Sequence, residues 1–318
     1  MAQAAAAEGT DEERPLLGIG LKMASVTAFV TMSALIKGAG QLPPGQIVFF
    51  RSAFAILPIL VWLALRGQMR GLLHTNRLKS HILRGLFGVT SMGLGFFGLT
   101  RLPLPDAVTL NYASPLVVVI FSALFVGESV RLFRWTAVVV GLIGVVIISW
   151  PKLTLLTTPG GMANDEALGV IAILCAAVMT AAAMIQVRGL VKTERTPTIV
   201  LYFSLTASVV GLATWFFGWA DLTRLQVALL VMAGFCGGIG QILMTQSYRH
   251  AAMSTIAPFE YTSMILAVVI GYLAFGDLPT VWTLTGGAIV IGSGLFIIWR
   301  EHRLGLERRA ARRFQPPQ

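Results

Sequence analysis

One carboxylate, Glu260, interrupts an apolar segment between Ser254 and Asp277 that is long enough to cross a lipid bilayer. A membrane-spanning helix needs about 20 apolar residues, and a charged group at its centre costs roughly 2.5–3.5 kcal/mol on insertion scales. A group retained at that cost is a candidate for function, either as a cation-linked or proton-linked group or as the partner of a substrate amine. The alternative is a structural ion pair with Lys22, which we expect at a similar depth in the first span.

The segment around Glu260 has a counterpart in the first half of the chain. Residues 106–128 align with the later segment at one constant spacing, and each block has a tyrosine directly after its polar position. The two tyrosines could offer a ring face and a hydroxyl to a planar substrate, or they could pack between helices. The chain therefore looks duplicated, and we expect the two polar positions near opposite mouths of one cavity. The matched pairs are Asn111 with Glu260, Tyr112 with Tyr261, and Glu128 with Asp277.

Other polar side chains also fall inside apolar segments. Arg51 could hold helices together or act as a gate, or it could contact an anion directly. Gln241 and Gln186 are expected to face the protein interior, where each could line a cavity or bond to a neighbouring helix. Pro115 and Pro258 are predicted to interrupt the fourth and ninth spans, because a proline removes a helical hydrogen bond.

The composition predicts a polytopic membrane protein. Of the 318 residues, 56% are hydrophobic and only 12% are charged, whereas soluble domains have about 25% charged residues. The formal net charge is +10, but the basic residues stand at the ends of apolar runs rather than on one nucleic-acid-binding face. Cys175 and Cys236 both lie inside apolar runs, which favours neither a disulfide framework nor a metal site.

Ten spans are predicted, and together they make an all-α protein. Lys and Arg gather in alternate connecting segments and in the tail at 300–318, so the positive-inside rule predicts that both termini are cytoplasmic. Residues 1–15 form a short tail without the pattern of a cleaved signal peptide. The predicted spans are 16–37, 46–65, 82–100, 107–127, 134–150, 168–187, 198–219, 225–247, 254–276 and 280–299.

An odd number of spans in each half has a topological consequence. Five helices in the first half, at 16–150, begin inside and end outside. After a linker at 151–167, the five helices at 168–299 must therefore begin outside. The two copies are then inverted around a pseudo-two-fold axis in the membrane plane, which is the arrangement that many alternating-access transporters use.

The duplicated blocks, and the glycine-spaced helix that follows each of them, resemble the drug/metabolite transporter superfamily, specifically its ten-helix EamA type. The resemblance covers residues 16–299. The sequence APFEYTS is similar to the corresponding motif in one branch of this superfamily, which contains bacterial S-adenosylmethionine-type and riboflavin-type permeases. The resemblance to this family implies a central cavity between the repeats, lined mainly by the first, third, fourth, sixth, eighth and ninth helices. The second block closes with Asp277, where the family pattern has Glu. We expect Glu128 and Asp277 to cap a helix or to form an ion pair at the hairpin.

These features predict a secondary transporter that moves a small organic metabolite across the bacterial inner membrane, and not an enzyme. The sequence has no Gly-x-x-x-x-Gly-Lys-Ser/Thr motif, so neither ATP nor another cofactor is expected. The expected partners are the substrate, the bilayer, and protons or another coupling ion, with no nucleic acid. Riboflavin-like, S-adenosylmethionine-like or amino-acid-derived solutes are compatible. The alternatives are a membrane-embedded enzyme acting on lipid-linked substrates, which would need clustered acids or histidines, and a non-transporting scaffold.

Overall fold

The computed structural model describes residues 15–67, 69, 72–125, 131–153, 162–190, 193–251 and 256–313. Within these residues all regular structure is helical, and ten helical stretches are long and apolar enough to cross a membrane. The predicted all-α architecture with ten spans is therefore confirmed.

The first half of the chain contributes five spans. Its fourth span is divided at Tyr112 into two helices, whereas each of the other four is a single helix. The elements are α1 (Pro15–Gly38), α2 (Pro44–Leu65), α3 (Leu78–Leu99), α4 (Leu104–Asn111), α5 (Ala113–Phe125) and α6 (Leu132–Leu153).

The second half contributes the other five spans. Its fourth span is divided at the matched position, directly after Tyr261, where a short 3-10 helix gives way to an α-helix. The last helix runs on through Arg313, past the predicted end at residue 299. The elements are α7 (Met162–Leu190), α8 (Thr196–Ala213), η2 (Thr214–Phe217), α9 (Arg224–His250), η3 (Ala257–Tyr261), α11 (Thr262–Phe275) and α12 (Val281–Arg313).

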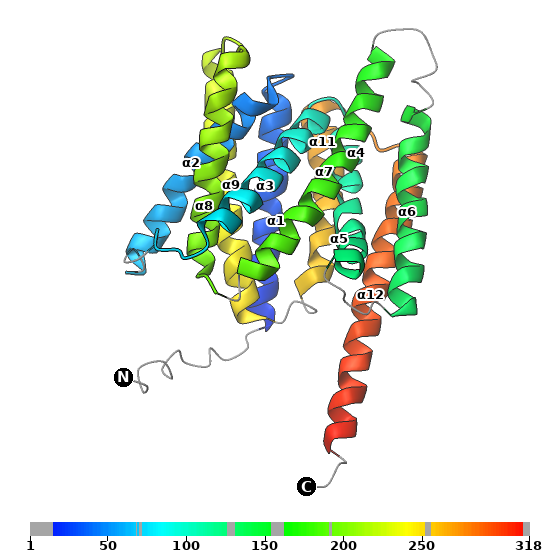
Figure 1. Ribbon diagram of the computed structural model, residues 1–318. Coiled ribbons are helices and arrows are strands. Elements are labelled where there is room, and N and C mark those ends of the chain that lie inside the picture. The colour runs from blue at the N-terminus through cyan, green and yellow to red at the C-terminus, as the bar shows by residue number, and fades with distance from the viewer. Residues whose placement is uncertain are drawn as a thin grey trace, which may run out of the picture.

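The two halves pack by exchanging equivalent helices. The first helix of each half lies against the third helix of the other, since α1 packs along α9 and α3 packs along α7. At one edge of the bundle α2 packs on α8, and at the opposite edge α6 packs on α12 (Figure 1). In the same view α1 begins and α12 ends at the lower face, whereas α6 ends and α7 begins at the upper face. This is the arrangement of two inverted five-helix repeats.

Apolar side chains from both repeats fill the middle of the bundle. Ile36 of α1, Leu110 of α4 and Ile173 of α7 are fully buried in one continuous core. Glycine lets the backbones of α3 and α7 approach closely, because a Cβ at Gly98 would lie 2.6 Å from the carbonyl oxygen of Gly169. The polar side chains considered below are therefore inserted into a largely apolar interface between the repeats.

Candidate functional site

Lys22 of α1 and Glu260 of η3 form an ion pair that joins the two repeats. The Lys22 ammonium donates a hydrogen bond to Oε2 of Glu260. The two side chains differ in environment, since that of Lys22 is 4% exposed and that of Glu260 is 49% exposed. The ion pair that the sequence offered as one interpretation is thus present, while a role for Glu260 in coupling stays a prediction.

A short 3-10 helix places Glu260 beside α1. Pro258 lies in the first turn of η3, where its missing N–H leaves no helical bond unmade. The 3-10 helix ends at Tyr261 and α11 follows at once, so the chain changes its helical geometry one residue after Glu260. Residues 252–255 lie outside the described part of the chain, so the predicted interruption of the span at Pro258 stays a prediction.

The matching break in the first repeat has a clear cause in Pro115. A proline ring clashes with the carbonyl of the residue four positions earlier, which here is Asn111, and α4 ends at that residue. The amide of Tyr112 instead bonds to the carbonyl of Thr109 at 3.1 Å, in a tighter turn. The exposed Asn111 side chain donates to the carbonyl of Ala107 at 3.0 Å. The predicted interruption of the fourth span is confirmed.

The two matched tyrosines meet between the repeats. Their ring centroids lie 5.2 Å apart with an interplanar angle of 72°, an edge-to-face contact. The buried Tyr112 hydroxyl lies 2.5 Å from Oγ of Ser263. Because the Ser263 hydroxyl donates its one proton to the carbonyl of Glu260 at 2.6 Å, it accepts from Tyr112. The tyrosine of the first repeat is therefore tied to the backbone of Glu260 in the second.

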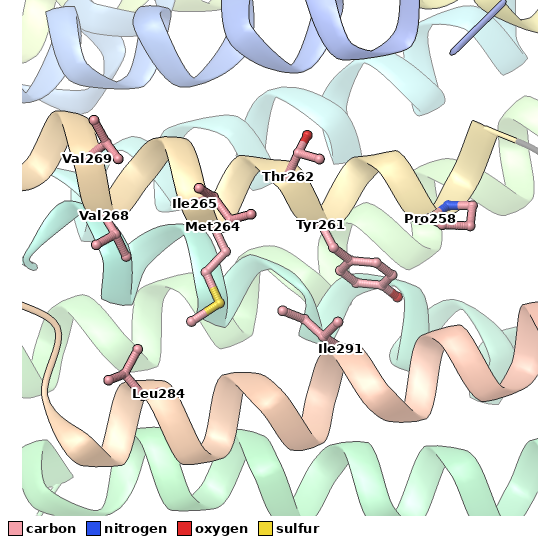
Figure 2. Close-up of a pocket in the computed structure, with 9 residues that line it drawn as sticks. All are labelled: Pro258, Tyr261, Thr262, Met264, Ile265, Val268, Val269, Leu284 and Ile291. Atoms are coloured by element: carbon pink, nitrogen blue, oxygen red, sulfur yellow. The ribbon is translucent and has the colours of Figure 1, made fainter. Parts of the chain in front are cut away.

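Tyr261 points away from α1 and toward α12. Figure 2 shows its ring beside Ile291, at one end of an apolar groove of ≈ 480 Å³ between α11 and α12. Ile265 and Val269 line this groove and are 66% and 48% exposed, so the groove opens on the outer surface of the bundle. In a membrane that surface faces lipid, and the groove is therefore not the predicted cavity between the repeats.

Arg51 of α2 and Gln241 of α9 line a second, much smaller cavity of ≈ 40 Å³. The structure brings Arg84 of α3 to the same cavity, a residue that the sequence analysis did not single out as a candidate. Gln186 of α7 is half-buried, and its side chain makes no hydrogen bond to a described residue. Of the predicted polar candidates, Arg51 and Gln241 thus share one site, and Gln186 does not join it.

A buried ionic cluster at the ends of α4, α6 and α12 was not predicted. Lys152 of α6 bonds to Oδ2 of Asp106 at 2.5 Å, and Thr283 of α12 donates to Oδ1 of Asp106 at 2.5 Å. Lys152 also lies 3.2 Å from a carboxylate oxygen of Glu166. The signal available in the sequence was a carboxylate opening the first duplicated block, but its partners lie far along the chain.

Asp277 links the same end of the bundle across the repeats. Its carboxylate lies 3.3 Å from Nζ of Lys37 and accepts a hydrogen bond from the backbone N–H of Leu104 at 2.9 Å. It therefore pairs with the end of α1 and caps the start of α4, in keeping with the capping or pairing predicted for a hairpin carboxylate. The matched Glu128 lies outside the described residues.

The side chains described above offer ionic and hydrogen-bonding groups for binding. Within the described ranges no group of three or more His, Cys, Asp or Glu side chains is placed to hold a metal ion. Cys175 and Cys236 are free thiols on α7 and α9.

Comparison with known proteins finds one matching family and several similar transporters. The family model described as EamA-like transporter family matches residues 16–150 and 167–299. The chain is 29% identical to the pseudopaline exporter of Pseudomonas aeruginosa strain UCBPP-PA14, over 86% of this chain and 93% of that protein. It is 27% identical to the S-adenosylmethionine uptake transporter of Rickettsia conorii, over 91% of this chain and 94% of that protein. It is also 27% identical to the riboflavin transporter of Rhizobium johnstonii, over 91% of this chain and 90% of that protein.

A solved crystal structure of a protein has the same architecture. It superposes with a TM-score of 0.60 and covers 90% of this chain and 98% of its own. The two sequences are 18% identical, so this likeness concerns the fold alone.

Proposed function

Because the chain belongs to the EamA-like transporter family, we propose that it moves a small organic metabolite by alternating access, with Lys22 and Glu260 as the coupling pair. The named relatives are transporters, and the chain is likewise a membrane transporter of small metabolites and not an enzyme. The exchanged packing of its two inverted repeats supports the cycle, because inverted repeats offer two related packings around one site.

The observation that carries the coupling proposal is the unequal burial of the Lys22–Glu260 pair. The ammonium is enclosed, whereas the carboxylate is 49% exposed. A proton or a substrate amine can therefore reach Glu260 while the pair is still formed. Neutralising Glu260 removes an attraction that holds η3 against α1, so these two elements can then separate more easily.

The substrate class follows from the relatives. Pseudopaline, S-adenosylmethionine and riboflavin are named for similar proteins. Riboflavin-like, S-adenosylmethionine-like or amino-acid-derived solutes are therefore the first compounds to screen, by saturable thermal stabilisation of the purified protein. We further propose that both tails face the bacterial cytoplasm and that the protein lies in the inner membrane, because basic residues gather at that end of the spans.

Uptake into proteoliposomes tests the coupling role. With a compound from the screen, wild-type protein is expected to accumulate it in response to a pH gradient, and Glu260→Gln is expected to lose that response. Unchanged accumulation by Glu260→Gln that still depends on the gradient would remove Glu260 from the coupling role.

The matched control is Asp165→Asn. Asp165 is also a half-exposed acid, with a side chain 46% exposed and a carboxylate oxygen 3.9 Å from Nε of Arg101. It belongs to α7 and does not bridge α1 and η3, so its replacement should leave accumulation unchanged. An equal loss in both variants would mean that removing any such carboxylate disturbs the protein.

A further inference from the structure

Two arginines of the first repeat line one small cavity between α2, α3, α8 and α9. Arg51 and Arg84 face it together with Ser204 and Gln241. Both arginines lie within membrane-spanning segments, so bulk water is not their usual surrounding. The volume of ≈ 40 Å³ exceeds the about 10–15 Å³ of such space that one water molecule needs, so the cavity has room for a small polar group.

Both arginines are half-buried, and part of each guanidinium is enclosed without a hydrogen-bond partner among the described residues. Nε of Arg51 and both Nε and Nη1 of Arg84 are buried, and no acceptor from the described part of the chain bonds to them. Within the described part of the chain no carboxylate forms an ion pair with either group. Glu194 is engaged elsewhere, since it accepts from Thr75 at 2.8 Å and lies 3.9 Å from Nε2 of His81. Buried polar groups are nearly always bonded, so this cavity lacks an acceptor.

The missing acceptor should be an anion with two oxygens. Two positive groups beside one enclosed space repel each other and have lost their water. Phe203 covers one face of Arg84, with 3.8 Å between the guanidinium carbon and the ring centroid, and this contact stabilises the charge without filling the donors in the guanidinium plane. The planar fork of a guanidinium matches the two oxygens of a carboxylate.

We propose that this cavity binds a carboxylate group of the transported metabolite, which makes the substrate an organic acid or a zwitterion. The identification of the anion as substrate rests on the proposed transport function, whereas the anion site itself does not. An adjoining cavity of ≈ 30 Å³ shares Ile59, Val200 and Gln241 with the first and is lined mainly by apolar side chains. The Gln241 amide therefore lies where a carboxylate and an apolar substituent would meet.

Gly237 of α9 leaves room for the Arg51 side chain. A Cβ at this position would lie 3.3 Å from Nε of Arg51 and 2.9 Å from Sδ of Met32. Gly237→Ala therefore crowds the Arg51 guanidinium without removing its charge, and it provides a test that does not depend on deleting an arginine.

Binding of formate tests the anion site without any transport measurement. The full chain is placed in nanodiscs of phosphatidylcholine, a lipid without net charge, and carbon-13 formate is titrated by NMR. Saturable binding is expected, and Arg51→Gln and Arg84→Gln should each weaken it by at least about tenfold. Arg66→Gln is the control, because Arg66 lies at the exposed end of α2 with its guanidinium 5.0 Å from the Trp62 ring.

Three further variants keep the test decisive where a Gln variant fails to fold. Arg51→Lys and Arg84→Lys retain the charge but lose the planar fork, and Gly237→Ala moves the fork, so each should also weaken formate binding by at least about tenfold. Wild-type protein that binds no formate, or variants that bind it as tightly as wild type, would overturn the site. Equal affinity for chloride would overturn its assignment to a carboxylate.

A transport arm separates the substrate claim from the proposed function. For a compound that the protein transports, replacing its carboxylate by a carboxamide is expected to reduce uptake at least about tenfold. A transported compound without a carboxylate would overturn the substrate claim. Formate binding that requires both arginines, in a protein that transports nothing across the panel, would support the anion site and contradict the proposed function.

Discussion

The ion pairs Lys152–Asp106 and Lys22–Glu260 each join helices far apart in the sequence, and they differ in how the carboxylate is surrounded. Asp106 is 1% exposed, and both of its oxygens are bonded, to Lys152 and Thr283 at 2.5 Å each. Glu260 is 49% exposed and pairs with Lys22. The same two kinds of group thus make a closed contact in one place and a half-open contact in the other.

This difference in exposure indicates which pair can respond to a ligand. A buried carboxylate with both oxygens bonded cannot change its proton or its partner without leaving donors unsatisfied. A half-exposed carboxylate can exchange its partner at lower cost, because water or a substrate replaces the lost bond. The Asp106 cluster lies where α6 ends and α12 begins, and we interpret it as a structural clamp. The Lys22–Glu260 pair is the one that we propose to be responsive.

Asp106→Ala is expected to have the largest effect on stability, and it tests whether the buried Lys152–Asp106 pair holds the helices together. This change leaves the Lys152 ammonium, which is 9% exposed, with Glu166 as its ion-pair partner. Breaking a buried pair from one side typically costs about 3–5 kcal/mol in the free energy of unfolding, and we expect a loss of that size. Denaturant unfolding of the purified protein in detergent measures it. A loss below about 1 kcal/mol would contradict the view of this cluster as a clamp.

Glu260→Gln is expected to cost less stability than Asp106→Ala. The Glu260 side chain is 49% exposed rather than enclosed, so we expect a loss of about 1–2 kcal/mol in the same unfolding measurement. Replacing both partners, by Lys22→Met together with Glu260→Gln, should recover part of that loss because no buried ammonium remains. A loss as large as that of Asp106→Ala would make the two pairs equivalent and end the distinction between them.

Tyr112→Phe should have the smallest effect of the three. It removes the hydrogen bond to Ser263 but keeps the ring contact with Tyr261, and interhelical hydrogen bonds in membranes contribute about 0.6 kcal/mol on average. Tyr261→Phe is the control, because its hydroxyl makes no hydrogen bond to a described residue. If the two variants lose equal stability, the bond between Tyr112 and Ser263 does not help to hold η3 in place.

The fold was readable from the sequence because lipid imposes a simple rule. Every span must be a long apolar helix, so the apolar segments predicted ten crossings, and the odd number of spans in each half predicted the inverted arrangement. The break of the fourth span was also predictable, since Pro115 acts on a residue four positions away along the same helix. Local rules of this kind reach along one helix and no further.

The contacts of the site join residues that lie on different helices and far apart in the sequence, so patterns along a single helix do not predict them. Asp106 was visible only as the first residue of a repeated block, and Lys152 only as a basic residue in a connecting segment, so their pairing was missed. Arg84 was not singled out, because Arg51, which lines the same cavity, belongs to another helix. The contact of Lys22 with Glu260 was weighed because both residues interrupt apolar spans at similar depth, which is a rare signal that crosses between helices.

The mismatch between Asn111 and Glu260 has a consequence for a carrier built from inverted repeats. Two identical halves would give inward-facing and outward-facing forms of equal energy. Here the matched positions carry an amide in one half and a paired carboxylate in the other, and a proline follows the break only in the first half. In the alternating-access cycle that we propose, the two forms would therefore differ in free energy, and the empty carrier would favour one of them, while the gradients would set the direction of net flow.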